Sequence, residues 1–138
     1  MTTKVQIPAE AMDLLERPIV VTLATVMSDG QPQATPVWFS FDGTQIWVNT
    51  ARGRAKDKNM TERPKVTILS VDPQDPYRYL EVRGQIDEVT EDGAVDHINQ
   101  LSANYLNRPD YYGDDEKRKS SETRVIYKIT PTRVSYHG

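Results

Sequence analysis

The segment from Arg52 to Lys65 carries six Lys or Arg residues and two acids, in a chain of 138 residues whose formal net charge is −3. It therefore has a local excess of four positive charges, and the rest of the chain carries −7. Arg binds phosphate through a fork of donors and Lys binds it as a point charge. Three interpretations are open at this point: a solvated basic helix face, a pocket for a phosphate or carboxylate ligand, and a nucleic-acid patch.

The position of Arg54, Lys56 and Asn59 favours the pocket. They follow a predicted strand at 44–51 and open a predicted helix at 53–63, where free backbone N–H groups and the helix dipole attract anions. Gly53 allows the backbone to approach a ligand closely. Residues two apart diverge on an ideal helix, so Arg54 and Lys56 converge on one ligand only if Arg54 lies before the helix.

Composition bears on the three interpretations of the basic segment in different ways. Charge runs are usually exposed faces, so composition alone favours a solvated helix. Nucleic acid is not expected as a partner, because the remainder of the chain repels phosphate and only Trp38 and Trp47 lie near for base stacking. The chain has no cysteine, two histidines and no His-x-x-x-His pattern, so no metal site is expected.

Other function classes have little support in the sequence. There is no nucleophile-elbow spacing for a hydrolytic triad, and no residue can be assigned as catalytic. No stretch approaches the roughly 20 apolar residues of a membrane helix, and the N-terminus has no signal-peptide run. We therefore expect a cytoplasmic protein that has no membrane partner.

Hairpins dominate the expected order of elements. Asp29-Gly30 and Asp42-Gly43 are hairpin turn signals, so residues 19–51 are predicted to form a three-stranded antiparallel meander. One domain spanning 1–138 is predicted, mainly β (α+β), as a closed or half-closed antiparallel barrel with short helices covering its ends. The expected strands are 19–27, 31–41, 44–51, 65–71, 77–89 and 123–137, and the expected helices are 8–17, 53–63 and 90–107.

Three stretches in this order carry a family resemblance: VVTLATVMSDGQPQATPVWFSFDG, ARGRAKDKNMTERPKVTILSVD and YRYLEVRGQID. They resemble the pyridoxamine 5′-phosphate oxidase-like split β-barrel superfamily, and within it the branch that uses the deazaflavin cofactor F420. The most specific part is the Arg-Ala-Lys-x-x-Asn block at 54–59. The chain is much shorter than pyridoxamine phosphate oxidases and lacks a second basic cluster, which argues against vitamin B6 chemistry.

The resemblance implies a six-stranded, FMN-binding-like split barrel that forms a homodimer, with cofactor sites in grooves at the dimer interface. It assigns the cofactor's phosphate to the block at 54–59, its ring system to strands 33–37 and 48–50, and a contact, from either subunit, to Tyr77. The cofactor-binding residues implied in this way are Gln33, Thr35, Pro36, Val37, Val48, Asn49, Thr50, Arg54, Ala55, Lys56, Asn59 and Tyr77.

The function implied is that of an F420-dependent oxidoreductase that transfers a hydride to a planar conjugated small molecule. The phosphodiester and polyglutamate tail of F420 suit a local positive segment in an acidic protein better than the single phosphate of FMN does. We expect the acceptor to stack near Trp38, Tyr77 and the loop around Tyr111. Two alternatives stay open: an FMN-binding flavoprotein, and a carrier of F420 or flavin without catalytic activity.

Overall fold

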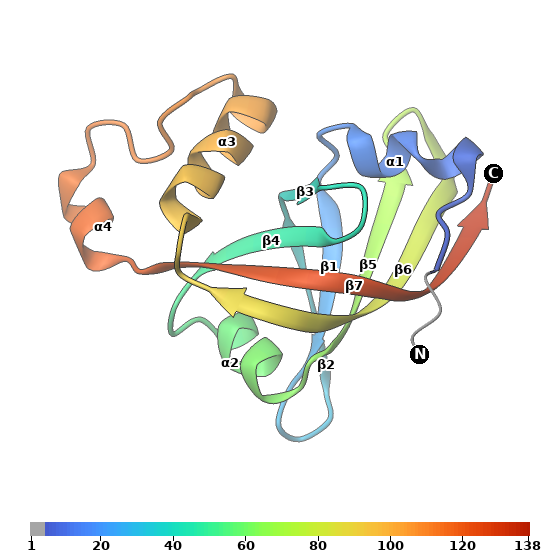
Figure 1. The fold of residues 1–138 in the computed structure, drawn as a ribbon, viewed down its shortest axis with the longest axis horizontal. Coiled ribbons are helices and arrows are strands. Elements are labelled where there is room, and N and C mark those ends of the chain that lie inside the picture. Colours follow the sequence, from blue (N-terminus) through green and yellow to red (C-terminus); the bar gives the residue numbers. More distant parts are fainter. Residues whose placement is uncertain (1–4) are drawn as a thin grey trace.

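One antiparallel sheet of seven strands organises residues 5–138, the part of the chain described by the structure, which is a computed structural model (Figure 1). Its spatial order is β2-β1-β5-β6-β7-β4-β3. The strands are β1 (Val21–Val26), β2 (Pro32–Val37), β3 (Phe39–Phe41), β4 (Ile46–Ala51), β5 (Lys65–Asp72), β6 (Asp75–Thr90) and β7 (Arg124–His137).

The two edge strands are neighbours in the chain. Trp38 alone separates β2 from β3, although these strands lie at opposite edges of the sheet. The sheet must therefore curl until its edges approach each other at Trp38, which makes it a half-barrel. The predicted mainly β, antiparallel barrel class is confirmed, with seven strands in place of six because the predicted strand 31–41 is split at Trp38.

Both pairings of the predicted meander over 19–51 are present, but its middle strand is divided between the two edges of the sheet. β1 pairs with β2, and β3 pairs with β4, as the two Asp-Gly turns indicate. However, β2 and β3 do not pair with each other, and the second neighbour of β4 is β7. Pro32 and Pro36 lie on the edge strand β2, which has a hydrogen-bonded neighbour on one side only. Prolines lack an N–H donor and are tolerated in such edge strands.

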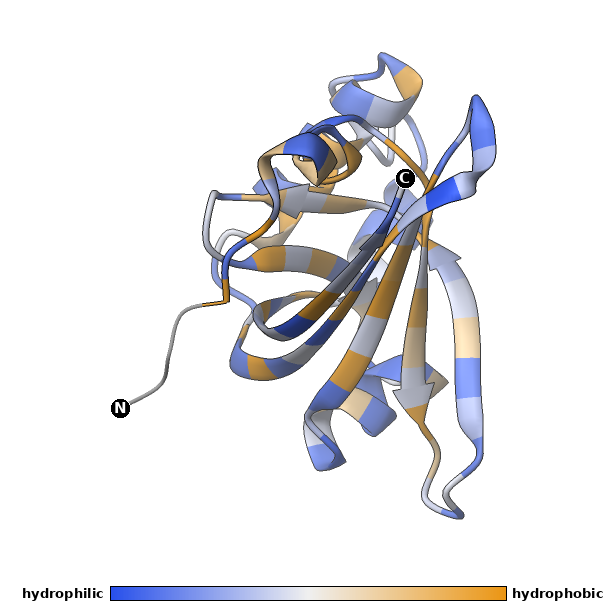
Figure 2. Ribbon diagram, turned by 90° about the vertical axis from the view of Figure 1, so that its right-hand side faces the viewer, coloured by the Kyte–Doolittle hydropathy of each residue, from blue (hydrophilic) through white to orange (hydrophobic). Residues whose placement is uncertain are grey.

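Alternation along the strands builds the core inside the curl. Apolar and polar residues alternate along the strands in Figure 2, as expected for sheets with one buried face. β1 contributes Val21 and Leu23 to the core, while β4 contributes Ile46 and Val48. Tyr127 on β7 is also fully buried there. The residues between them in sequence face away from this core.

The longest strands, β6 and β7, bend together at Gly84. Their register shifts between Arg83 and Gly84, and Gly84 pairs with Pro131. A Cβ at Gly84 would contact Ile129 and lie 3.0 Å from the Thr130 carbonyl oxygen, so only glycine fits. Gly84 therefore marks a bulge with a close backbone approach, and β7 runs through Pro131 as a single strand.

The helices lie at the ends and edges of the half-barrel. A 3-10 turn (Ala9–Ala11) leads into α1, while α3 and α4 lie over one end of β4 and β7 (Figure 1). No helix of residues 5–138 is long and apolar enough to cross a bilayer. The α-helices are α1 (Asp13–Glu16), α2 (Ala55–Glu62), α3 (Ala94–Leu106) and α4 (Glu116–Ser121).

The third long helix begins later than predicted. Thr90 was expected to open it, but Thr90 pairs with Ile126 as the last residue of β6. The helix starts only after Gly93, whose positive φ of 74° turns the chain. Its end agrees with the prediction, because Asn107 caps it in a left-handed conformation.

Candidate functional site

A cavity of about 360 Å³ opens beside the corner where β2 passes into β3. β4 and β7 form its floor, α3 forms one wall, and the start of α2 supplies charge. The lining residues are Val20, Pro36, Val37, Trp38, Asn49, Arg54, Lys56, Ile98, Leu101, Tyr111 and Arg124. Five of the twelve predicted site residues are among them: Pro36, Val37, Asn49, Arg54 and Lys56.

The start of α2 brings Arg54 and Lys56 to one cavity. Arg54 is the N-cap residue and is extended, with ψ of 158°, so it lies before the helix. Lys56 is the second residue of the helix proper. The geometric condition for these two side chains to converge is therefore met.

Asp57 fixes the turn that precedes this helix. Its carboxylate accepts hydrogen bonds from the Gly53 backbone N–H at 2.9 Å and from Arg52 Nη1 at 3.2 Å. The buried Tyr127 hydroxyl also donates to it. Gly53 has a φ of +92°, and a Cβ there would meet nothing within 4 Å. Glycine is thus required by the backbone conformation, whereas the sequence had suggested close approach to a ligand.

Lys56 is a half-buried cation in need of a counterion. Among residues 5–138 it makes no hydrogen bond or ion pair, and its charged neighbours Arg54 and Arg124 repel it. Burial, with Arg54 and Arg124 nearby, lowers its pKa. A half-buried cation is costly unless it is paired, so this geometry favours an anion from outside the chain.

Arg124 is the basic residue of the cavity that sequence analysis missed. Its side chain is 3% exposed, its Nε donates to Asn49 Oδ1 at 2.9 Å, and its Nη1 lies 3.3 Å from Glu122. The sequence feature that could have identified it is the alternation of Arg124, Ile126 and Lys128 with apolar residues at the start of the last strand. That pattern places Arg124 on a covered face of β7, where an arginine is rarely without a partner.

Ser40, His97 and Asn49 form a chain that resembles a hydrolytic triad. His97 Nε2 lies 2.9 Å from Ser40 Oγ, and His97 Nδ1 lies 3.1 Å from Asn49 Nδ2. Asn49 Nδ2 also donates to the Ala94 carbonyl, and Asn49 Oδ1 accepts from Arg124, which fixes the orientation of the amide. His97 Nδ1 must then accept, and Nε2–H must donate to Ser40, so His97 cannot remove a proton from this serine.

His97 is buried, with 4% of its surface exposed. Burial and the nearby Arg124 and Lys128 lower its pKa to about 4. It is therefore neutral at neutral pH. Its role is to orient Asn49, which in turn holds Arg124 at the cavity.

Aromatic rings form another part of the cavity lining, and Arg124 lies over the ring of Tyr111 at 5.3 Å from its centroid. Trp38 stacks on Tyr105 with ring centroids 5.2 Å apart, and it meets Tyr111 edge-on at 6.0 Å. Tyr111 comes from the segment 107–123, which contains α4, and its backbone N–H bonds to Asn99 on α3 at 2.9 Å. The predicted proximity of Trp38 and the loop around Tyr111 agrees with this arrangement.

Four of the remaining predicted residues belong to the strands. Gln33 accepts a hydrogen bond from Thr25 at 3.1 Å and is half-buried, as is Thr35. Val48 and Thr50 face the core on the opposite side of β4 from Asn49, and each is 1% exposed. The side chains of these four residues do not line the cavity.

Three predicted residues lie outside the cavity for other reasons. Asn59 is 3% exposed and joins α2 to the β1–β2 hairpin, with Nδ2 donating to Thr25 at 3.0 Å and Oδ1 accepting from Arg63 at 3.3 Å. Ala55 is exposed at the first helical position. Tyr77 is 79% exposed near the start of β6, and it does not line the cavity of its own chain.

Comparisons with known proteins agree with this architecture. The sequence profile of the family described as pyridoxamine 5′-phosphate oxidase matches residues 7–138. A solved structure named F420 reductase is 34% identical, with a TM-score of 0.79 over 94% of this chain and 98% of that chain.

Two more distant structures share the fold. The conserved hypothetical protein Rv2991 from Mycobacterium tuberculosis is 24% identical, with a TM-score of 0.76 over 99% of this chain and 89% of that one. General stress protein 26 from Bacillus anthracis is 22% identical, with a TM-score of 0.67 over 93% and 91%. The family match spans nearly the whole chain and agrees with the half-barrel, so this chain belongs to the pyridoxamine 5′-phosphate oxidase family.

Proposed function

We propose that this protein is an F420-dependent oxidoreductase that acts as a cytoplasmic homodimer and reduces a planar conjugated acceptor. The observation that carries the proposal is the half-buried Lys56, which has no anionic partner among residues 5–138 and lines a cavity that Trp38 and Tyr111 also line. The likeness to a structure named F420 reductase supports the choice of cofactor.

The described residues fit such a cofactor in two respects. Lys56 and Arg54 supply a point charge and a donor fork for its phosphate at the start of a helix. The cavity of about 360 Å³ lies at the lower end of the range for ligand sites, and it has room for a ring system beside Trp38. The polyglutamate tail is then left in solvent.

When bound, reduced F420 supplies a hydride from C5 of its deazaflavin ring. The protein's part is to bind, orient and exclude water. Val37, Ile98 and Leu101 give the cavity an apolar lining, while Trp38 offers a flat surface for stacking.

Tyr111 is the residue we propose as a proton donor to the reduced product. Its side chain lines the cavity, and its hydroxyl accepts a hydrogen bond from Arg118 Nη2 at 2.6 Å. The hydroxyl's own proton is therefore not used in that bond and can be donated. Tyr111→Phe is expected to lower kcat at least tenfold while the Kd for F420 stays within twofold. An unchanged kcat would remove Tyr111 from the mechanism.

A titration with F420 and with FMN tests the binding proposal. We expect the purified protein to bind F420 more tightly than FMN, and Lys56→Ala to weaken F420 binding at least tenfold. Lys58→Ala is the matched control, because Lys58 is exposed on the same helix and does not line the cavity. If Lys56→Ala binds F420 as the wild type does, the pocket assignment is wrong.

FMN is the second candidate cofactor, since the matching family is described by the name of a pyridoxamine phosphate oxidase. A protein that purifies yellow, with flavin absorption bands, and binds FMN at least as tightly as F420 would favour it. Oxidation of reduced F420 by a panel of quinones and unsaturated lactones tests catalysis. Tight F420 binding without turnover of any acceptor would point to a carrier.

A further inference from the structure

Glu122 is the carboxylate that neutralises part of the basic cluster. It accepts hydrogen bonds from the Tyr112 hydroxyl at 2.9 Å and from Arg54 Nη2 at 3.1 Å. Arg124 Nη1 lies 3.3 Å from it and Arg118 Nε lies 3.4 Å from it. One acid therefore serves three arginines beside the unpaired Lys56.

The carboxylate is held in place without Arg54. Tyr112 is 5% exposed and Arg124 is almost fully buried, so two of its partners belong to the folded interior. Arg118 is fixed over the rings of Tyr111 and Tyr112, at 4.9 and 5.7 Å from their centroids. Burial opposes ionisation of Glu122, yet the bond from Tyr112 and the charges of Arg118 and Arg124 hold its pKa below the ordinary value.

Arg54 differs from the other partners. It comes from the start of α2 rather than from the segment 107–123 or β7, and its side chain is 43% exposed. It can therefore turn towards a ligand without disturbing the other bonds of Glu122. A phosphate that binds Arg54 must share this guanidinium with Glu122 or take it over.

We propose that Glu122 is a specificity-determining residue that favours phosphodiesters over phosphomonoesters at the Arg54–Lys56 site. The fixed carboxylate repels every bound anion, and the repulsion grows with the ligand's charge. A phosphomonoester carries close to two negative charges at neutral pH, whereas a phosphodiester carries about one. Glu122 thus lowers the affinity of the site for a phosphomonoester more than its affinity for a phosphodiester.

This proposal rests on the proposed function for its biological meaning, because F420 contains a phosphodiester and FMN a phosphomonoester. Its chemistry can be tested without either cofactor. Methyl phosphate and dimethyl phosphate are a matched pair of probes that differ mainly in charge. Their binding to wild-type protein and to Glu122→Gln can be followed by NMR titration.

We expect Glu122→Gln to bind methyl phosphate roughly tenfold more tightly than the wild type does, and dimethyl phosphate roughly threefold more tightly. The Kd values for FMN and F420 are expected to change in the same proportions, so the preference for F420 narrows. Glu116→Gln is the control, because Glu116 is exposed on α4 and makes no ion pair within residues 5–138. It removes the same charge and should change each Kd by less than twofold.

Glu122→Asp keeps the charge and is expected to keep the wild-type ratio of methyl to dimethyl phosphate affinity. Equal tightening for both probes in Glu122→Gln, or no tightening for methyl phosphate, overturns the proposal. These outcomes are distinct from failure of the proposed function, which appears as wild-type protein that binds neither F420 nor FMN. A melting temperature for each variant confirms that the fold is intact.

Discussion

Of the two histidines in the chain, only His97 is buried, and its neutral state is built into the fold. It packs beside Trp47 and bonds to Ser40 and Asn49, while Arg124 and Lys128 oppose a positive charge there. In the unfolded chain its pKa returns to about 6.5. The unfolded state therefore binds a proton at a pH where the folded state does not.

The sign of the resulting pH dependence follows from this difference. Since the folded pKa is about 4, stability falls as pH drops below about 6.5 and stops falling near 4. We expect the free energy of unfolding to decrease by about 2 kcal/mol between pH 7.5 and pH 5, measured by urea denaturation. His97→Gln should flatten this change, while His137→Gln, at an exposed position, should keep it. An equal slope in the wild type and in His97→Gln would contradict the assignment.

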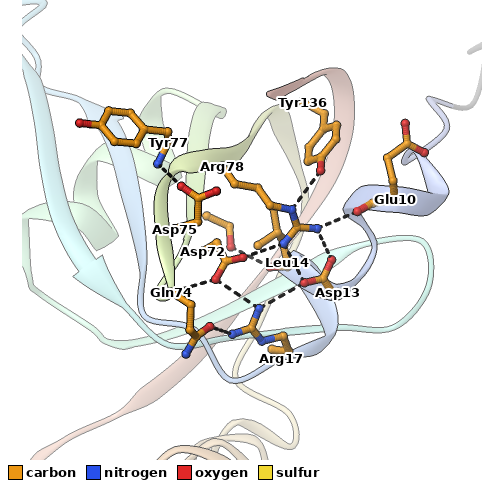
Figure 3. A network of polar contacts seen from close by, with 11 residues as sticks. Glu10, Asp13, Leu14, Arg17, Asp72, Gln74, Asp75, Tyr77, Arg78 and Tyr136 are labelled. Carbon is orange, nitrogen blue, oxygen red and sulfur yellow. Dashed lines mark hydrogen bonds and ion pairs between the residues drawn. The ribbon is translucent and has the colours of Figure 1, made fainter. Parts of the chain in front are cut away.

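At the scale of elements, a polar network attaches α1 to the β5–β6 hairpin (Figure 3). Arg78 on β6 donates to Asp13 Oδ1 at 2.6 Å, to Asp72 Oδ2 at 2.9 Å and to the Glu10 carbonyl at 2.7 Å. It also bonds to the Tyr136 hydroxyl at 3.0 Å. One guanidinium thus joins α1, the hairpin and the end of β7, and α1 is too short to be stable alone.

We expect Arg78→Ala to lower the melting temperature by about 5 °C and to speed hydrogen exchange in residues 9–17. Arg108→Ala is the control, because Arg108 is exposed after α3 and makes no ion pair among residues 5–138. The hydrogen bond from Arg78 lowers the pKa of Asp13 to about 2. The contribution of this ion pair to folding stability is therefore present above about pH 4 and is lost as the pH falls from 4 to 2. Equal melting temperatures for the two variants would contradict this anchoring role.

The elements that local signals define were predicted, and those that depend on distant partners were not. Gly30 and Gly43 mark real hairpin turns, because an Asp-Gly pair favours a turn with positive φ whatever lies further away. The passage of the chain at Trp38 from one edge of the sheet to the other could not be predicted from a local signal. Alternation tells which face of a strand is buried, but it does not tell which strand lies beside it.

The same limit applies to the cavity. Arg54 and Lys56 stood out because they are close together in sequence, next to a predicted helix start. Arg124 and Glu122 are about seventy residues away, and folding alone brings them to Arg54. A partner so distant leaves no local pattern, so nothing in the sequence around Glu122 indicates that it pairs with Arg54.

At the scale of the whole molecule, one face of the half-barrel is left open. A hollow of about 600 Å³ lies on β1, β5 and β6, lined by Ala24, Val26 and Thr67 among others. Its lining mixes apolar residues with the charged Lys65 and Arg83, as the surface of an interface between subunits does. The proposed homodimer gives this face an occupant, and it gives Tyr77 a cavity to reach, since Tyr77 does not line the cavity of its own chain.

We expect the protein to sediment as a dimer at micromolar concentration, and Ala24→Arg to sediment as a monomer, because an arginine in the lining of the hollow places a charge in the interface. If the partner's Tyr77 completes the site, the monomeric variant should also bind F420 at least tenfold more weakly. Ala103→Arg is the matched control, since it adds the same side chain at an exposed position on α3. A wild-type monomer that binds F420 at full affinity would show that each chain holds a complete site, and the hollow would then need another explanation.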